Sequence, residues 1–208
     1  MTKEEKVKEI IKRLYKVYPH PRTALEYKTP LELLIATILS AQTTDKLVNT
    51  ITPLLFQKYK TANDFADAPV EEIDEMIKKV NFHNNKAKSI KAAAKIIVEK
   101  HNGKVPDNME DLDALPGVAR KTANVVLGNA FKKAEGVVVD THVMRLSRKL
   151  GLTDEKDPVK IERDLMRIVP RDKWIDFSHM LINFGRQFCP ARPHVCKDCP
   201  LKDLCPDR

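Results

Sequence analysis

Residues 115–123 read Leu-Pro-Gly-Val-Ala-Arg-Lys-Thr-Ala, and this stretch decides the fold because it places a tight turn directly before a helix. Pro116 fixes φ and Gly117 supplies the positive φ of a hairpin, so the backbone N–H groups that follow are expected to point outward at the positive end of the helix dipole. Such a helix end binds phosphate without needing a side chain. Lys121 lies on the first turn of this helix. The stretch therefore predicts a phosphate-binding turn with an amine beside it.

The helix that follows the turn has a clear core-facing side. Counting from Ala123, apolar residues recur at i+3, i+4 and i+7, namely Val126, Leu127 and Ala130. At roughly 100° per residue, Lys121 lies about 200° from Ala123 around the helix. The lysine is therefore predicted to point away from the core.

The composition is that of a folded, basic protein. Its 208 residues are enough for one large or two small domains, and 42% of them are hydrophobic. Lys plus Arg exceed Asp plus Glu by 37 − 29 = 8, and the pI is about 9.2. This charge favours a polyanionic partner, either nucleic acid or a membrane surface, without choosing between them.

No segment of the sequence is predicted to span a bilayer or to direct export. The longest apolar stretch, Leu31–Leu39, is short and carries Glu32 and Thr37. Residues 1–18 lack the continuous apolar centre of a signal peptide, and their acidic residues argue against a transit peptide. We expect a soluble, intracellular protein, cytoplasmic if its source is prokaryotic.

Helical periodicity recurs along the sequence, whereas the alternation typical of strands is almost absent. Only Val137–Val139 has an extended pattern, and a run of this length fits a connecting segment better than a sheet strand. We therefore predict an all-α fold. Its clearest apolar stripes are Val7, Ile10, Ile11, Leu14 and Tyr18; Ile73, Met76, Ile77 and Val80; and Ile90, Ala93, Ala94 and Ile97.

Capping residues mark several helix ends. Thr2-Lys3-Glu4-Glu5 and Thr29-Pro30-Leu31-Glu32 have the spacing of capping boxes, and Asp157-Pro158 offers an N-cap followed by a proline at the first helical position. Asn102-Gly103 is typical of a helix C-terminus. These signals predict three helix starts and one helix end.

All four cysteines lie in a C-terminal segment that becomes rich in Cys, Pro and basic residues after Gly185. Their spacing is C-x6-C-x2-C-x5-C, from Cys189 through Cys196 and Cys199 to Cys205. Two disulfides would suit a small secreted domain better than a basic helical protein. Structural zinc usually takes two C-x2-C pairs, and only one is present here. An iron–sulfur cluster accepts wider, unequal spacing, so the spacing favours a cluster and leaves zinc open.

Three features together resemble the endonuclease III family of base-excision DNA glycosylases: the lysine after the hairpin turn, the sequence Val139-Asp140-Thr141-His142, and the cysteine spacing. The segment Ser40-Ala41-Gln42-Thr43-Thr44-Asp45 adds to the resemblance, which runs from about Leu25 to Cys205. The resemblance implies a base-excision repair enzyme that removes damaged, oxidised pyrimidines from double-stranded DNA and then nicks the abasic site.

The resemblance also implies two helical domains with the DNA cleft between them. A six-helix domain is expected over residues 23–133, with the helix-hairpin-helix motif at about 109–131. Residues 1–22 and 134–208 are expected to form the second domain, whose loop 189–205 binds a [4Fe–4S] cluster through the four cysteines. Damaged duplex DNA is the expected partner, no membrane is involved, and the chain is expected to be a monomer.

By the same resemblance, Lys121 is the nucleophile, Asp140 assists it, and six residues contact DNA: Gln42, Asp45, Phe82, Gly117, Ala119 and Arg120. The hairpin departs from the family's usual Gly-Val-Gly at Ala119, whose methyl group stands where backbone approaches phosphate. Phe82, in the loop Asn81-Phe82-His83-Asn84, takes the position of a leucine wedge and could stack as well as wedge. Gln42 and Phe82 are the candidates for filling the gap that a flipped nucleotide leaves.

A lysine nucleophile needs a lowered pKa, because a solvated lysine with a pKa near 10.4 is free amine in roughly one molecule per few thousand at pH 7. Arg120, the helix N-terminus and partial burial in a cleft all disfavour the ammonium form at position 121. Asp140 does not, since a neighbouring carboxylate stabilises an ammonium. We expect Asp140 to accept a proton from the attacking amine and to stabilise positive charge that develops on the sugar.

Each of these residues also has a structural interpretation. Lys121 could be a phosphate contact or a solvated lysine, Asp140 and Asp45 could be helix N-caps, and His142 is interpreted as structural. Two rival functions remain. One is a monofunctional mismatch or adenine glycosylase, relatives of which carry Ser or Tyr at the position of Lys121. The other is a non-catalytic helix-hairpin-helix DNA-binding protein with a structural metal.

Overall fold

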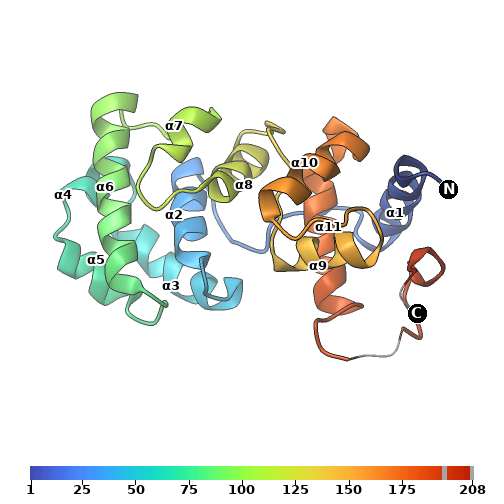
Figure 1. Ribbon diagram of the computed structural model, residues 1–208. Helices are drawn as coiled ribbons and strands as arrows, with labels where there is room; N and C mark the ends of the chain where they lie inside the picture. Colours follow the sequence, from blue (N-terminus) through green and yellow to red (C-terminus); the bar gives the residue numbers. More distant parts are fainter. Residues whose placement is uncertain (194–195, 207–208) are drawn as a thin grey trace. The chain divides into compact units, whose positions relative to one another are not determined.

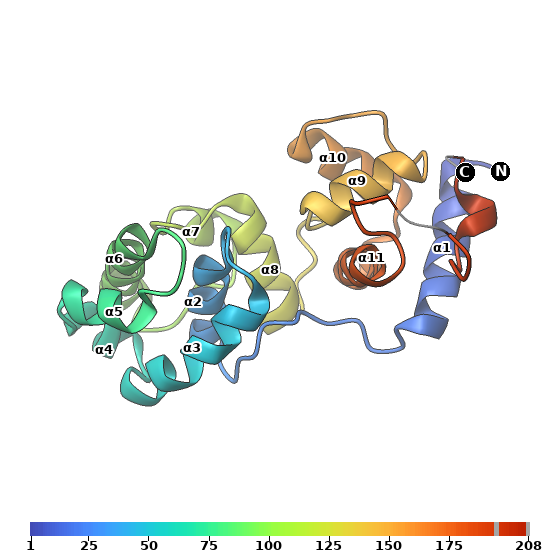
Figure 2. The ribbon, with the colours of Figure 1, turned by 90° about the horizontal axis from the view of Figure 1, so that it is seen from below.

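The computed structural model describes residues 1–193 and 196–206, and within these ranges all regular secondary structure is helical. The predicted all-α fold is confirmed. The chain divides into two compact units, Thr23–Lys133 on the one hand and Met1–Arg22 with Ala134–Arg208 on the other. Figures 1 and 2 show the helices of each unit from two directions. In the described ranges no helix is long and apolar enough to cross a membrane.

The unit of residues 23–133 is built around α2 (Pro30–Ser40), which packs against three of its neighbours, α3, α6 and α8. Every residue from Leu33 to Leu39 is buried, as expected of a helix that is apolar on all sides. In both views α2 lies among the other helices of its unit. These are α3 (Asp45–Lys58), α4 (Ala62–Asp67), α5 (Val70–Ile77), α6 (His83–His101), α7 (Met109–Asp113) and α8 (Arg120–Ala130).

The other unit is built around α11 (Trp174–Gln187), whose Phe177, Met180, Leu181 and Phe184 are buried. It packs against α1 (Lys3–Val17) and α9 (Thr141–Lys149), and α10 (Pro158–Ile168) packs against the same two helices. Two short 3-10 helices, η1 (Arg171–Lys173) and η2 (Lys202–Leu204), complete this unit.

The N-terminal helix holds the C-terminal segment in place. Arg13 of α1 makes two parallel hydrogen bonds to the carboxylate of Asp203, at 2.5 and 2.9 Å. The same guanidinium donates to the carbonyl oxygen of Pro200 at 3.1 Å. The N-terminal helix α1 and the segment around η2 therefore lie side by side within this unit, as both views show.

Three of the predicted helix ends form as expected. Thr2 and Glu5 make both bonds of a capping box, and Asp157 caps α10 through the N–H of Lys160, with proline at the first helical position. Asn102 takes a left-handed conformation after α6, and Gly103 N–H donates to the carbonyl oxygen of Ile97 at 3.0 Å.

The predicted capping box at Thr29 is wrong in one of its two bonds. Thr29 caps α2 by accepting a hydrogen bond from the N–H of Glu32 at 3.2 Å. The Glu32 carboxylate, however, accepts from the N–H of Lys28 at 2.5 Å. The glutamate reaches back one residue further than the box requires, so it satisfies a donor that lies before the cap.

Val137–Val139 forms no strand, as predicted. All three valines are buried, and they lie directly before Asp140, the N-cap of α9. Their β-branched side chains serve packing rather than sheet formation, because the described ranges hold no strand for them to pair with.

Candidate functional site

The hairpin between α7 and α8 requires a glycine. Gly117 has φ of +78°, and a Cβ placed on it would lie 2.8 Å from the Cβ of Ser89 on α6. The turn is closed by a hydrogen bond from Val118 N–H to the carbonyl oxygen of Leu115 at 3.0 Å. Both the backbone conformation and the close packing therefore exclude a side chain at position 117.

The N-terminus of α8 carries no side-chain cap. Ala119 occupies the N-cap position in an extended conformation and makes no side-chain capping bond. The first backbone hydrogen bond of the helix is donated by Ala123 N–H to the carbonyl oxygen of Ala119 at 3.0 Å. The N–H groups of the first turn thus have no intrahelical partner, and a helix end of this kind favours an anion.

Lys121 lies on the first turn of α8 and is exposed, as are Gly117, Ala119 and Arg120. Ala123, Val126 and Leu127 of the core-facing stripe are buried and Ala130 is partly buried, which confirms the prediction that the lysine points away from the core. The partial burial of Lys121 in a cleft stays a prediction. Its position at a helix end and outside the stripe accounts for the exposure of Lys121.

Gln42 and Phe82 lie on two adjoining loops of the same unit. Gln42 follows α2, and Phe82 immediately precedes α6. Both have left-handed backbone conformations, with φ of +54° and +58°, and the Phe82 side chain is 60% exposed. Asn81 joins the loops, because its amide donates to the carbonyl oxygen of Gln42 at 2.6 Å. The two side chains proposed for filling a gap in DNA thus come from neighbouring loops.

Lys86 is a residue near this site that the sequence analysis missed. It lies on the first turn of α6, is buried, and donates to the carbonyl oxygens of Leu39 and Ala41 at 2.8 and 2.5 Å. Burial lowers the pKa of Lys86. One signal could have revealed it: Lys86 precedes Ile90 by four residues, so it falls on the apolar stripe of the helix.

The Phe82 loop is held on its other side by α5. Asp74 contacts the ring nitrogen Nδ1 of His83 at 2.6 Å and accepts from the amide of Asn84 at 2.8 Å. These two residues directly follow Phe82. The carboxylate therefore fixes the first turn of α6 beneath the exposed aromatic ring.

Asp45 is not the cap of its helix. The hydroxyl of Thr44 caps α3 by accepting from Leu47 N–H at 3.3 Å, and Asp45 is the first residue inside the helix. The structural interpretation of Asp45 as an N-cap is therefore wrong by one residue. Its carboxylate still lies in the first turn, where negative charge is favourable.

Asp140 is the N-cap of α9, in the unit of residues 1–22 and 134–208. Its carboxylate accepts from Val143 N–H at 2.8 Å, and the residue is half-buried. A capping bond uses one carboxylate oxygen and fixes the side chain, which leaves the charge available for a second task.

His142 of α9 packs closely against α11. A Cβ placed on Gly185 of α11 would lie 2.7 Å from the His142 ring, so the close approach depends on this glycine. Burial is the main cause that lowers the pKa of His142; Arg145 and Arg186 lower it further, while Asp140 opposes them. These contacts support the structural interpretation of His142.

None of the four cysteines forms a disulfide. Cys189 is buried after the end of α11, and Cys196, Cys199 and Cys205 are half-buried. Burial raises the pKa of the Cys199 thiol, and the charges of the other three thiols raise it further. The four thiols therefore share one electrostatic environment.

Two contacts bind the cysteine loop to α9. The guanidinium of Arg145 lies 3.7 Å from Sγ of Cys189, and Sγ of Cys205 lies 3.8 Å from the carbonyl oxygen of Lys149. Among residues 1–193 and 196–206, no three His, Cys, Asp or Glu side chains are arranged around a single metal ion.

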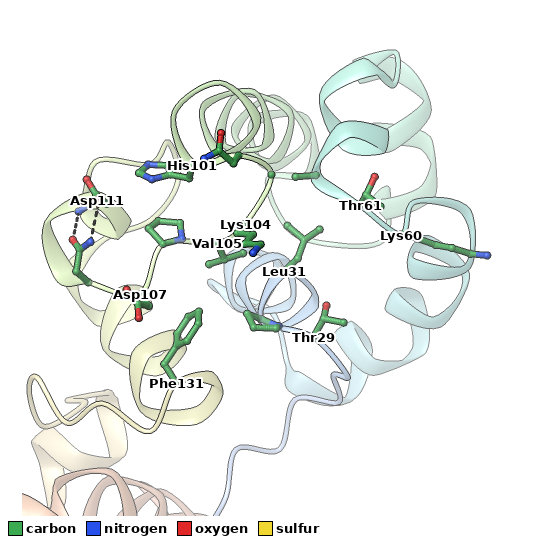
Figure 3. A pocket seen from close by; sticks show the side chains of 16 residues that line it. Thr29, Leu31, Lys60, Thr61, His101, Lys104, Val105, Asp107, Asp111 and Phe131 are labelled. Atoms are coloured by element: carbon green, nitrogen blue, oxygen red, sulfur yellow. Dashed lines mark hydrogen bonds between the residues drawn. The ribbon is translucent and has the colours of Figure 1, made fainter.

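A cavity of about 680 Å³ lies elsewhere in the unit of residues 23–133 (Figure 3). Its walls include Thr29 at the start of α2, His101 at the end of α6, and Asn108, whose side chain accepts from Asp111 N–H at 2.9 Å. Thr29 and His101 lie at the ends of α2 and α6 that are opposite to the Gln42 and Phe82 loops. None of the candidate site residues lines this cavity.

Residues 35–171 match the HhH-GPD superfamily base excision DNA repair proteins, which defines the class of protein that this fold and hairpin belong to. The similarity to curated proteins extends over nearly the whole chain. The sequence is 52% identical to the endonuclease III of Synechocystis sp. over 205 residues, which are 99% of this chain and 94% of that protein. It is 46% identical to the endonuclease III of Bacillus subtilis over 190 residues, 91% of this chain and 86% of that protein. The chain belongs to the endonuclease III family.

Solved structures agree with this assignment. The structure of a trapped covalent intermediate of an endonuclease III with DNA superposes with a TM-score of 0.92 at 39% identity, covering 100% of this chain and 97% of that one. A thermostable thymine-DNA glycosylase has a TM-score of 0.87 at 27% identity, covering 98% of this chain and 96% of that one. The fold is thus shared with relatives of more than one substrate preference.

Proposed function

We propose that this protein is a bifunctional DNA glycosylase and abasic-site lyase of base-excision repair. It removes damaged, oxidised pyrimidines from duplex DNA and nicks the strand at the abasic site, acting as a monomer inside the cell. The observation that carries the proposal is the exposed Lys121 on the uncapped first turn of α8, directly after the Gly117 hairpin. In a member of the endonuclease III family, this places an amine beside a phosphate-binding helix end.

The hairpin binds the DNA backbone. Arg120 is an exposed residue on the first turn of α8, and the helix dipole favours negative charge at this end. Gly117 and Ala119 let the phosphate approach the backbone, with the methyl group of Ala119 as the largest obstacle. Asp45 and the excess of positive charge on the chain contribute to positioning rather than to base recognition.

Gln42 and Phe82 fill the gap left by the flipped nucleotide. Extruding a nucleotide costs a few kcal/mol, and least for a damaged base. The exposed Phe82 ring can wedge between bases or stack on the base opposite the lesion, and Gln42 supplies a polar group from the adjoining loop.

Lys121 is the nucleophile. Its amine forms a bond to the sugar C1′, and the bond from C1′ to the damaged base breaks with the electron pair leaving on the base, which takes up a proton. The bond from C1′ to the ring oxygen O4′ then breaks, O4′ keeps the electron pair and takes up a proton, and the nitrogen loses its remaining proton as the double bond of the Schiff base forms. Removal of a proton from C2′ then breaks the bond between C3′ and its phosphate oxygen, so the strand is nicked by β-elimination. Water releases the sugar fragment and regenerates the amine.

Asp140 accepts a proton from the attacking amine and stabilises positive charge on the sugar as the base departs. Its capping bond to Val143 holds the carboxylate in one orientation. A fixed carboxylate suits this role, because it needs no reorganisation during the reaction.

Cys189, Cys196, Cys199 and Cys205 fit a [4Fe–4S] cluster. The set consists of four thiols with no disulfide among them, and the pKa of Cys199 is raised mainly by burial, with a smaller contribution from the charges of the other three. Thiolates are the ligands of such clusters, and a bound cluster would supply a rigid cross-link for the loop. Arg13, through Asp203 and Pro200, ties the same loop to α1. Zinc is the competing occupant, and metal analysis separates the two.

A monofunctional glycosylase, in which water attacks in place of an amine, is the second candidate. The similarity to a thymine-DNA glycosylase structure is the observation that favours it. Lys121 argues for the bifunctional enzyme, since the monofunctional relatives that the sequence resembles carry Ser or Tyr there.

The test is cleavage of a panel of duplexes that contain oxidised pyrimidines, abasic sites or mismatches. Wild-type protein is expected to release the base and nick the strand at oxidised pyrimidines. Lys121→Ala is expected to do neither, whereas Lys95→Ala, at an exposed position of α6, retains both. Asp140→Asn keeps the helix cap, because Asn caps as well as Asp, and isolates the role of the charge. Intact strands with every substrate would indicate a non-catalytic DNA-binding protein.

A further inference from the structure

Two strained loops stand at the proposed DNA interface. Gln42 and Phe82 adopt left-handed conformations that residues other than glycine seldom take. Such conformations persist only where the surrounding structure holds them. The bond from Asn81 to the Gln42 carbonyl oxygen joins the loops, and Asp74 of α5 holds the Phe82 loop, but neither contact anchors the Gln42 loop to the core.

Lys86 supplies that anchor. Its ammonium donates to the carbonyl oxygens of Leu39 and Ala41 and lies 3.3 Å from the hydroxyl of Thr43. These contacts use all three N–H groups of the ammonium. The acceptors flank Gln42 on both sides in the sequence, and Lys86 itself follows Phe82 by four residues. The buried ammonium of Lys86, which lies just after the Phe82 loop, thus bonds to the backbone of the Gln42 loop.

The electrostatics of α2 explain why a lysine suits this place. The last turn of α2 contains no basic residue of its own, and its carbonyl groups form the negative end of the helix dipole. Lys86 brings a positive charge to this end from α6. The side chain is only 8% exposed, and a buried ammonium is tolerated only when its donors are paired. The charge therefore stays with these acceptors and keeps the loop in one conformation.

We propose that Lys86 is a positioning residue. Its buried ammonium fixes the Gln42 loop to the first turn of α6, so that Gln42 and Phe82 enter the duplex together in a conformation that is already formed. The inference rests on the proposed function and adds to it the element that prepares these two residues for base flipping. Loops that are already fixed lose no further conformational entropy when they enter DNA, and this favours opening of the base pair.

Lys91 provides a matched control on the same helix. Its ammonium also donates to a backbone carbonyl, that of Ala68 after α4, and this contact involves neither the Gln42 nor the Phe82 loop. Replacing either lysine by methionine keeps the aliphatic stem and removes the charge. Lys91→Met loses one bond to a backbone carbonyl oxygen and Lys86→Met loses two together with the contact to Thr43, but only Lys86→Met releases the Gln42 loop.

The experiment compares two DNA substrates in single-turnover reactions. One is a duplex with an oxidised pyrimidine, in which the base pair must be opened and the gap left by the flipped nucleotide must be filled. The other carries an abasic site in an unpaired bubble, where no base pair has to be opened. Lys86→Met is expected to slow the duplex reaction by at least about ten-fold and to leave the bubble reaction within about two-fold of wild type. A 2-aminopurine beside the lesion reports opening, and its fluorescence rise is expected to shrink in this variant.

Lys86→Arg, which keeps the charge and the donors, is expected to recover most of the duplex activity, and Lys91→Met is expected to leave the ratio of the two rates unchanged. If Lys86→Met does not fold, Asn81→Ala removes the second tie between the loops and is expected to show a smaller, duplex-only loss. Equal losses on both substrates, or an unchanged duplex rate, would overturn the proposal. Wild-type protein that cleaves neither substrate would instead overturn the proposed function, and this inference with it.

Discussion

Gly117 and Ser89 are in such close contact that a Cβ on the glycine would lie 2.8 Å from the serine Cβ and 3.1 Å from its hydroxyl oxygen. The contact joins the hairpin before α8 to α6. Ser89 follows Lys86 by three residues, so one face of α6 supports both the hairpin and the Gln42 loop. The hairpin and the Gln42 loop therefore share a single helical support.

Gly117→Ala is expected to destabilise the protein. The positive φ and the clash with Ser89 should together lower the free energy of unfolding by about 1–3 kcal/mol, measured by urea denaturation. Ser89→Gly in the same chain removes the clash but not the backbone strain, so it should recover part of the loss. Strictly additive losses in the double variant would contradict the contact.

Ala119→Ser is expected to stabilise the fold and weaken DNA binding. A serine at the N-cap would accept from an N–H of the first turn of α8, a gain of about 1 kcal/mol in the free energy of unfolding. The same bond would compete with a DNA phosphate and weaken binding to duplex DNA by about five-fold. Ala119→Gly leaves the N–H groups open and should bind at least as tightly as wild type. Tighter binding by the serine variant would show that the helix end does not hold phosphate.

Much of the fold could be predicted because periodicity follows burial. Val7, Ile10 and Leu14 on one helix and Ile90 and Ile97 on another are all almost completely buried, as their spacing indicated. Lys86 was missed for the same reason. A lysine on an apolar stripe is ordinarily exposed, and its acceptors lie up to 47 residues earlier in the chain, beyond the reach of a local pattern.

For the site, the local features could be predicted and the tertiary ones could not. The positive φ of Gly117 follows from turn chemistry alone. The left-handed conformations of Gln42 and Phe82 do not, because neither residue favours them and contacts from distant parts of the unit maintain them. The same holds for Thr44, which takes the cap expected at Asp45.

Arg13 is expected to slow the loss of metal from the cysteine loop. Protein purified without oxygen should be yellow-brown and contain about four iron atoms per chain. Arg13→Gln removes the bonds to Asp203 and Pro200 and should speed the release of iron to a chelator. Lys12→Gln, next to it on the exposed side of α1, should not. A colourless, zinc-loaded protein would exclude the cluster.

His142 should reduce stability in acid. Burial lowers its pKa in the folded protein below the ordinary value of about 6.5, so the unfolded chain binds more protons as the pH falls through that value. The stabilising contribution is complete above pH 6.5 and is lost as the pH falls towards the folded pKa. Urea denaturation at pH 7.5 and 5.5, under conditions where the metal content is constant, should show a smaller pH dependence for His142→Asn. An identical pH dependence in both proteins would contradict the assignment.

The central claim is that the Lys121 amine becomes covalently bonded to DNA. Borohydride reduction during reaction with DNA containing an oxidised pyrimidine or an abasic site traps a Schiff base as a stable protein–DNA adduct, which is resolved by gel electrophoresis and located by peptide mass. Wild type and Lys95→Ala are expected to give an adduct on the peptide that contains Lys121, and Lys121→Ala is expected to give none. An adduct of normal yield with Lys121→Ala, or one located on another residue of the wild-type protein, would contradict the account.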